Sequence, residues 1–419
     1  MKKLLFASML VASVAVSADQ TISAERLTRV DHLFEQYVDE ARIGGAVALV
    51  LQDGKPVYER AFGWSDKEAG RKMTTDTIFR IASQSKALTS VAILSLMEEG
   101  KIGLNDPAGR YIPTFAKTTV AVATDQGAPS VVPAKRPITI RDLLTHTSGI
   151  AYSFVDARLA KLDDGHKSTA ELPLVCDPGE RFVYGPNTAV LGDIIAKVSG
   201  MPLDAVFATR IFEPLGMHDT AFSVPRAKRD RVVTVHTRAV DGSLREMRNP
   251  VTLTAPPRGD GGLFSTAADY ARFMQLFLNR GRLGTTRLIS DRTFELMTSN
   301  EIGSLRVAEQ PSSDPSVARP FPLGAGKDTF GFGFQIEGRP AAAHMRSPGS
   351  LSWGGIFNTH FWIDPQRSLA AVVLMQVLPY YDPAALGVLR GFEREVYRMG
   401  RVKPPPPAVH RPAIFASLE

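Results

Sequence analysis

Two kinds of hydrophobic spacing open the chain. Apolar side chains recur every three or four positions between residues 27 and 38, which predicts an amphipathic helix with one buried face. The runs 46–51 and 57–62 are then rich in strand-forming residues, and Asp53-Gly54 lies between them. Because Asp-Gly readily adopts the positive φ angles of a tight turn, this pattern predicts a β-hairpin.

A second helix and a long helical region follow. The apolar run at 87–99 ends at Gly100, a typical helix terminator, and predicts a largely buried helix. From about 101 to 250, helices and turns prevail over strand-like runs. A further helix is expected to begin where Thr266 and Asp269 have the spacing of a capping box.

The last third of the chain returns to strands. Residues 330–336 predict one strand, and the runs 359–363 and 369–375 predict a second hairpin. A final amphipathic helix is expected at 383–397. The stretch 309–327 is rich in Pro, Ser and Gly and predicts a long loop, a kind of segment that is often functional.

This order of elements predicts an α+β fold. Strands from the two ends of the chain most simply join into one antiparallel sheet, flanked by the N- and C-terminal helices. The helical region at about 101–250 then lies beside the sheet, and the active site is expected in the cleft between them. We assign one catalytic domain to residues 19–402 and a Pro-rich C-terminal tail to residues 403–419.

Residues 1–18 have the pattern of a signal peptide. Lys2 and Lys3 precede an apolar stretch at 4–16, which is too short for a transmembrane helix. Small residues at Val16-Ser17-Ala18 predict cleavage after Ala18. We therefore expect an exported protein, periplasmic or secreted, and no later segment is apolar enough to span a membrane.

The overall composition is that of an ordinary globular protein. Hydrophobic residues make up 44% and charged residues 22%, and the net charge of +6 is spread along the chain. One basic cluster, at 226–231, lacks interleaved aromatic residues, so a nucleic-acid partner is not expected. The single cysteine, Cys176, cannot form an internal disulfide and is taken as structural. The sequence does not specify an oligomeric state.

The most informative chemical pattern is Ser83-Gln84-Ser85-Lys86 at the start of the second helix. Residues three apart share a helix face, so the Ser83 hydroxyl and the Lys86 amine are expected to be neighbours. An amine beside a serine can take its proton and activate it as a nucleophile. Alone the pattern is weak, because Ser83 could simply cap the helix while Lys86 faces solvent.

Two further motifs carry chemistry. Tyr184 lies in a Gly/Pro-rich turn just before a predicted helix, where a phenol near an ammonium group could act as a general base. Trp353-Gly354-Gly355 precedes a predicted strand, and paired glycines there allow close backbone approach by a ligand or by another segment. A packed tyrosine and a β-bulge are the alternative readings of these two motifs.

Together these segments resemble the serine β-lactamase and penicillin-binding-protein superfamily, in its class C-like branch, and most closely the family VIII carboxylesterases. The matching stretches run through nearly the whole mature chain and include residues 79–86, 104–107, 111–113, 138–149, 259–266, 331–334 and 353–355. The resemblance implies an antiparallel sheet flanked by helices and a serine hydrolase that needs no metal or cofactor. Its substrate would be a small-molecule ester or β-lactam.

The resemblance also implies roles for individual residues. Ser83 corresponds to the acylated nucleophile, Lys86 to its base partner and Tyr184 to the second member of the proton relay. The backbone N–H groups of Ser83 and Ile356 correspond to the oxyanion hole. Trp353-Gly354-Gly355 occupies the place where β-lactamases carry Lys-Thr-Gly, and so implies substrate contacts.

Two departures from the family pattern matter. Pro186 stands where β-lactamases place an asparagine, so we expect Asn187, one residue later, to take the substrate-binding role. Trp353 replaces the cation that holds a substrate carboxylate, and losing such a contact costs about 1.5–3 kcal/mol. This change favours neutral, short-chain esters as substrates.

Two other functions stay open. A class C-like β-lactamase or D-alanyl-D-alanine carboxypeptidase would need another cation, for which Arg346 is a candidate. A catalytically silent binding protein is the third reading. Gly-x-Ser-x-Gly, His-Glu-x-x-His, Cys/His clusters and nucleotide-binding fingerprints do not occur in the sequence, so α/β-hydrolase, zinc and nucleotide sites are not indicated.

Overall fold

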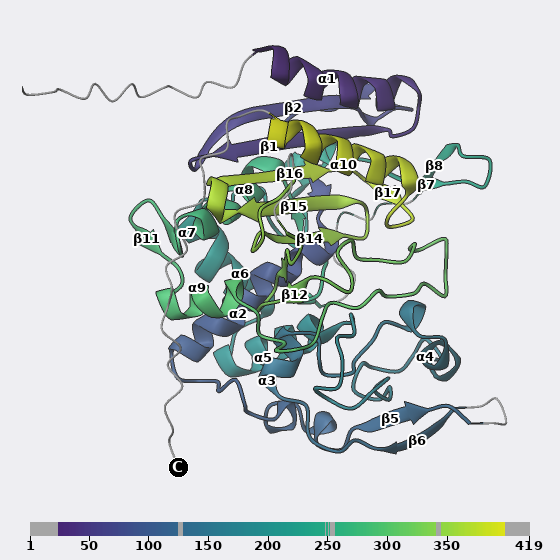
Figure 1. Ribbon diagram of the computed structural model, residues 1–419, viewed down its shortest axis with the longest axis vertical. Coiled ribbons are helices and arrows are strands. Elements are labelled where there is room, and N and C mark those ends of the chain that lie inside the picture. Colours follow the sequence, from purple (N-terminus) through teal and green to yellow (C-terminus); the bar gives the residue numbers. More distant parts are fainter. Residues whose placement is uncertain are drawn as a thin grey trace, which may run out of the picture.

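Figure 1 shows the computed structural model of the chain, which describes residues 24–124, 129–247, 249, 251, 256–340 and 345–398. The predicted signal peptide and the Pro-rich tail lie outside these residues. Among the described helices, none combines the length and the apolar sequence that crossing a bilayer requires.

The centre of the structure is an eight-stranded antiparallel sheet, as the sequence predicts. Its strands, in spatial order, are β12 (Thr329–Phe330), β13 (Gln335–Ile336), β14 (Leu351–Gly355), β15 (Thr359–Asp364), β16 (Leu369–Leu374), β1 (Gly45–Gln52), β2 (Lys55–Asp66) and β3 (Arg71–Lys72). The two half-sheets join where β1 pairs with β16, with Val47 opposite Leu374. The predicted α+β fold is therefore confirmed.

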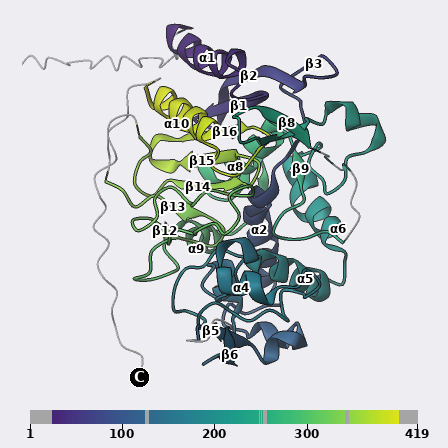
Figure 2. The same cartoon turned by 90° about the vertical axis from the view of Figure 1, so that its right-hand side faces the viewer.

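Helices cover both faces of this sheet (Figures 1 and 2). Helices α1 (Ala24–Asp39) and α10 (Pro383–Arg398) pack on one face, and α8 (Ala267–Leu278) packs on the other. Alternate residues of β1 point to opposite faces, so Val47 and Leu49 enter the core under α8, whereas Ala48 and Val50 enter the core under α1 and α10. Burial on both faces explains why β1 is almost continuously apolar.

The helical region adjoins the α8 face. It contains α3 (Ile140–Leu144), α4 (Ala157–Leu162), α5 (Asn187–Ser199), α6 (Leu203–Phe207) and α7 (Glu213–Leu215), and the buried helix α2 (Ser85–Glu98) packs against α5 and α6. Helix α9 (Asp291–Thr298) follows α8. Short strands complete the fold: β4 (Phe79–Arg80) with β9 (Phe264–Ser265), β5 (Thr119–Val122) with β6 (Ser130–Pro133), β7 (Val235–Arg238) with β8 (Leu244–Met247) and β17 (Val377–Leu378), and β10 (Arg282–Leu283) with β11 (Thr286–Arg287). The hairpins β5–β6 and β7–β8 were not expected inside this region.

Local turn chemistry behaves as the sequence predicts. Asp53 and Gly54 have φ angles of 51° and 72°, and Gln52 pairs directly with Lys55 across the turn. At the start of α8, the Thr266 side chain accepts a hydrogen bond from the Asp269 backbone N–H. The hairpin turns at residues that adopt positive φ angles, and the helix begins at a side chain that accepts a hydrogen bond from a free backbone N–H.

The expected strand at 330–336 is wrong, because this run folds back on itself as the hairpin β12–β13. The Gly331 N–H donates to the Phe334 carbonyl at 2.9 Å, and Gly333 has a φ of 103°. Phe332 and Phe334 are both fully buried in the turn. Alternating Phe and Gly therefore produced the two-residue period of a strand, although the glycines allow a tight turn.

Candidate active site

Ser83 lies in a 3₁₀ turn, Ala82–Gln84, that leads directly into α2. The preceding residue, Ala82, has a φ of 44°, in the left-handed region that residues with a Cβ rarely adopt. The chain is held there by a backbone hydrogen bond from Ile81 to Leu263 of 3.0 Å. Backbone strain of this kind is concentrated at functional sites, and here it lies next to the candidate nucleophile.

Lys86 is 2% exposed, and its amine contacts three oxygen atoms. Nζ lies 3.0 Å from Ser83 Oγ, which confirms that the two side chains share a helix face. It also donates to the Asp260 carbonyl oxygen at 2.7 Å and lies 3.1 Å from the Tyr152 hydroxyl. The amine is therefore fixed beside the nucleophile, and Lys86 does not face solvent.

Tyr152, Asp260 and Arg258 belong to this site, and the sequence analysis missed them. The Tyr152 hydroxyl donates to Asp260 Oδ2 at 2.8 Å, and Arg258 donates to both carboxylate oxygens of Asp260 at 3.0 and 3.1 Å. Tyr152 follows shortly after the family motif that ends at Gly149, and Asp260 lies inside the motif at 259–266. Their neighbourhood was therefore visible in the sequence, but their contact with Lys86 was not.

Tyr184 faces the same cleft without contacting the lysine through its hydroxyl. Lys86 Nζ lies 4.9 Å from the centroid of the Tyr184 ring, and in the described part of the chain no hydrogen bond joins the two. The Tyr184 hydroxyl instead accepts a hydrogen bond from Trp353 Nε1 at 3.3 Å. Its backbone N–H donates to Gln310 Oε1 at 2.9 Å, which ties the turn to the predicted loop at 309–327.

Strand β14 forms the opposite wall. Trp353 is 8% exposed and packs against the rings of Tyr184 and Phe330, at centroid distances of 5.0 and 5.5 Å. A Cβ on Gly355 would lie 2.3 Å from the Ile81 carbonyl oxygen, so this glycine lets the end of β14 approach the segment before Ser83. Ile356, the next residue, lines the same pocket as Ser83.

Gly354 faces the other side of the sheet. A Cβ there would lie 2.7 Å from both His360 Nδ1 and the Tyr380 hydroxyl. The paired glycines thus serve two different close approaches, one on each face of β14. Gly354 borders the pocket, and Gly355 allows it to form.

Asn187 is not placed for the role expected of it. The side chain is fully buried and does not line the pocket. Its Oδ1 accepts a hydrogen bond from Ser148 Oγ, and its Nδ2 lies 2.9 Å from His146 Nδ1 and 3.4 Å from the Ile150 carbonyl oxygen. Asn187 therefore stabilises the loop before α4, and His146 serves as its hydrogen-bonding partner in the core.

Arg346 does not supply a cation to this pocket. Its Nε and Nη2 donate to the two carboxylate oxygens of Glu393 on α10, both at 2.9 Å. The ion pair is buried and lines a second cavity, which adjoins the pocket that contains Ser83 at Trp353, Gly354 and Tyr380, but Arg346 does not line the Ser83 pocket. The charge of Arg346 is thus compensated within the protein.

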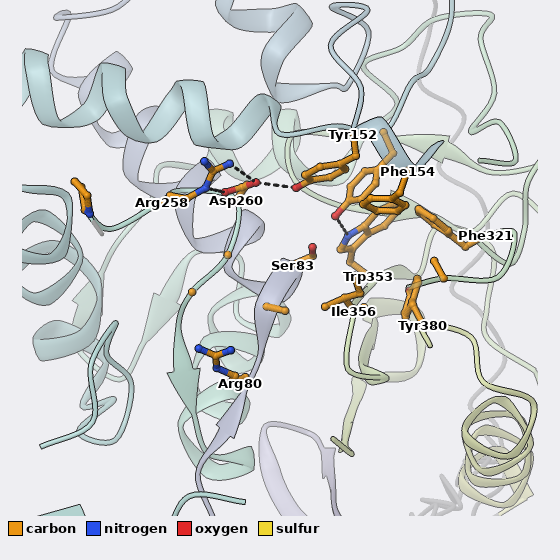
Figure 3. Close-up of a pocket in the computed structure, with 17 residues that line it drawn as sticks. Arg80, Ser83, Tyr152, Phe154, Arg258, Asp260, Phe321, Trp353, Ile356 and Tyr380 are labelled. Carbon is orange, nitrogen blue, oxygen red and sulfur yellow. Dashed lines mark hydrogen bonds and ion pairs between the residues drawn. The ribbon is translucent and has the colours of Figure 1, made fainter. Parts of the chain in front are cut away.

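The pocket at Ser83 has a volume of about 350 Å³, and its two ends differ in chemistry. Figure 3 shows Ser83 between an aromatic side and a side that carries Arg80, Arg258 and Asp260. The aromatic side is formed by Tyr152, Phe154, Tyr184, Phe321, Trp353 and Tyr380. Phe321 comes from the loop at 309–327, so this loop forms part of the site. Among the described residues, no group of three or more His, Cys, Asp or Glu side chains could hold a metal ion.

Known proteins share this architecture. The sequence matches the Beta-lactamase family over residues 30–390. Protein Rv1367c of Mycobacterium tuberculosis is 34% identical over 373 residues, which cover 84% of this chain and 90% of the relative. Esterase EstB of Burkholderia gladioli is 30% identical over 393 residues, which cover 87% of this chain and 94% of the esterase. Among solved structures, the LovD6 mutant of simvastatin synthase from Aspergillus terreus has a TM-score of 0.78 at 26% identity and covers 90% of this chain and 98% of that one.

Proposed function

Because the chain belongs to the beta-lactamase family and is a serine hydrolase of the β-lactamase-like type, we propose that it cleaves short-chain, neutral carboxylic esters through an acyl-enzyme on Ser83. One observation carries the proposal. Ser83 Oγ lies 3.0 Å from the buried amine of Lys86, inside a pocket that one uncharged aromatic wall bounds. A nucleophile, a base and a place for an apolar acyl group are thus present together.

The proposed reaction proceeds in two stages. Lys86 accepts the Ser83 hydroxyl proton while Oγ forms a bond to the ester carbonyl carbon. The backbone N–H groups of Ser83 and Ile356 stabilise the oxyanion, the carbon–oxygen bond to the alcohol breaks, and the Lys86 ammonium returns its proton to the leaving oxygen. Water then attacks the acyl carbon and gives a proton to Lys86, the bond from that carbon to Ser83 Oγ breaks, and the ammonium returns the proton to Oγ as the acid leaves. The Tyr184 hydroxyl borders the pocket and is available to donate a hydrogen bond to the leaving oxygen.

Trp353 supports neutral esters over β-lactams. The ring is buried in the pocket wall and carries no charge, and its N–H is already donated to Tyr184. Arg346, the other candidate cation, is paired with Glu393. The relative EstB is named an esterase, which agrees with this preference. A class C-like β-lactamase remains the alternative, because Arg80 and Arg258 border the opposite end of the pocket.

Ser83→Ala tests the mechanism. We expect ester hydrolysis to fall by about 10³-fold or more, with an unchanged melting temperature, because the side chain loses one oxygen. Intact-mass spectrometry after treatment with a fluorophosphonate should show one adduct on the wild-type protein, and peptide mapping should place it on Ser83. An adduct on another residue, or full activity of the alanine variant, would refute the assignment.

The substrate class is tested by comparing p-nitrophenyl butyrate with a chromogenic cephalosporin. We expect a higher kcat/KM for the ester. A higher kcat/KM for the cephalosporin would mean that a cation at the Arg80 and Arg258 end holds the substrate carboxylate, and the protein would be a β-lactamase.

The remaining assignments are part of the same proposal. We place the protein with the family VIII carboxylesterases and expect export after cleavage at Ala18, with a catalytic domain at 19–402. N-terminal sequencing of the protein recovered from the medium or periplasm of an expressing bacterium would test both the export and the cleavage position.

A further inference from the structure

We infer that Asp260, held by Arg258 and acting through Tyr152, is a positioning residue that directs the Lys86 amine toward Ser83. The inference rests on the proposed function, because it assumes that Lys86 is the base for Ser83. Figure 3 shows Arg258, Asp260 and Tyr152 joined by hydrogen bonds in a row beside Ser83.

The main chain at Asp260 is fixed by tight packing. A Cβ on Gly259 would lie 2.2 Å from the Thr188 carbonyl oxygen of α5, so only glycine fits between the helices. From the other side, Thr89 Oγ1 of α2 donates to the Gly259 carbonyl at 2.5 Å. These contacts hold the next carbonyl, that of Asp260, at 2.7 Å from Lys86 Nζ.

The carboxylate of Asp260 fixes the second partner of Lys86. Arg258 donates to both carboxylate oxygens, and the Tyr152 hydroxyl donates to Oδ2 at 2.8 Å. Because the single hydroxyl hydrogen of Tyr152 points at Asp260, its oxygen lone pairs are left to accept an N–H from Lys86, 3.1 Å away. Without the carboxylate, the hydroxyl could rotate and donate toward the amine instead.

This arrangement decides where the lone pair of Lys86 points. A neutral amine has two N–H bonds and one lone pair, and the two N–H bonds are assigned to the Asp260 carbonyl and to Tyr152. The lone pair is left to point at Ser83 Oγ, which lies 3.0 Å from Lys86 Nζ. Lys86 can therefore accept the serine proton without first rotating, which is the requirement for an effective general base.

The charges around the amine are consistent with this role. Lys86 is faced by the titratable side chains of Asp260, Tyr152, Tyr184 and His146. Burial and the negative charge of Asp260 raise the pKa of Tyr152 well above its usual range, so this residue stays a neutral phenol. Burial alone would raise the pKa of Asp260, but the charge of Lys86 and the hydrogen bond from Arg258 lower it. Burial lowers the pKa of His146 well below its usual range, which keeps this ring neutral.

The test compares Asp260→Asn and Tyr152→Phe in hydrolysis of p-nitrophenyl butyrate. We expect kcat to fall about 10- to 100-fold in each variant, with KM changed by less than about threefold, because proton transfer is affected more than binding. The double variant should be no slower than the slower single variant.

Asp193→Asn is the matched control. Asp193 is an exposed carboxylate on α5 whose charge also acts on Arg258, but it is not hydrogen-bonded to Tyr152 or Lys86 in the described structure. It should keep the wild-type kcat and KM. If Asp260→Asn does not fold, Tyr152→Phe, which removes one oxygen, still decides the question.

The outcomes separate this inference from the proposed function. If the wild-type protein neither hydrolyses the ester nor is labelled at Ser83, the proposed function fails. If it does both, but Tyr152→Phe and Asp260→Asn keep kcat within about twofold of wild type, only the positioning role is refuted. It is also refuted if the losses of the two single variants multiply in the double variant, because two separate structural roles would give that result.

Discussion

Trp353→Phe is a sharp test of how the aromatic wall acts on catalysis. The substitution keeps an apolar ring in place but removes the indole N–H that donates to the Tyr184 hydroxyl. At 3.3 Å this hydrogen bond is slightly longer than the usual N–H···O range, so its contribution should lie at the low end, about 0.5–1 kcal/mol. If it orients Tyr184 toward the leaving group, kcat/KM should fall about two- to fivefold.

A double-mutant cycle separates orientation from packing. We would measure kcat/KM for p-nitrophenyl butyrate with wild type, Trp353→Phe, Tyr184→Phe and the double variant. Once the Tyr184 hydroxyl is absent, Trp353→Phe should have no further effect. Independent losses in the cycle would refute the claim that Trp353 acts through Tyr184.

Trp362→Phe supplies the packing control. Trp362 is a fully buried tryptophan on the neighbouring strand β15, in the core on the other face of the sheet. Its N–H has no hydrogen-bond partner among the described residues. Trp362→Phe should therefore lower the melting temperature without changing kcat/KM, and an equal loss of activity would show that the Trp353 effect is only one of packing.

Three predictions concern stability, measured by urea denaturation. Arg346→Met should lower the free energy of unfolding by about 3–5 kcal/mol, because Glu393 is left as a buried unpaired charge, and adding Glu393→Leu should recover much of the loss. Ala82→Gly should raise it by about 1 kcal/mol, because glycine adopts a φ of 44° without strain, and a loss of stability would contradict the strain assigned there. Burial raises the pKa of Asp328 to about 6, so its contribution to stability is present at low pH and is lost as the pH rises through that value. Asparagine does not titrate. The free energy of unfolding of Asp328→Asn, relative to that of wild type, should therefore increase between pH 4 and pH 7.

The parts of the fold predicted correctly depend on local chemistry or on a general rule of sheet formation. Asp53-Gly54 specifies its own turn. The β1–β16 junction joins opposite ends of the chain and follows because two apolar half-sheets have unpaired edges. The hairpin at β12–β13 was missed because two buried phenylalanines imitate the period of a strand. Whether such a run forms one strand or a hairpin depends on the core residues around it, and these are distant in the sequence.

The same limit applies to the site. Ser83 and Lys86 share a helix face, so their contact could be inferred from spacing alone. Tyr152 and Asp260 meet Lys86 only through tertiary packing, and nothing in their own segments indicates it. For Asn187 the sequence predicted a contact that the structure does not show. A one-residue shift at the start of α5 points its side chain into the core, although we expected it to contact the substrate.

The junction of β1 with β16 also bears on when the enzyme becomes active during synthesis. The nucleophile, the base and their positioning residues are all encoded before residue 261, but Ile356 and the strands that hold it come from the last quarter of the chain. An N-terminal fragment would also expose the unpaired edge of β1, which needs β16 to complete the sheet. Because so many contacts join distant segments, folding should be slow, and the central sheet should form only when synthesis of the chain is nearly complete. We therefore expect a chain interrupted before β14 to carry Ser83 and Lys86 but to lack the wall of the cleft in which they react.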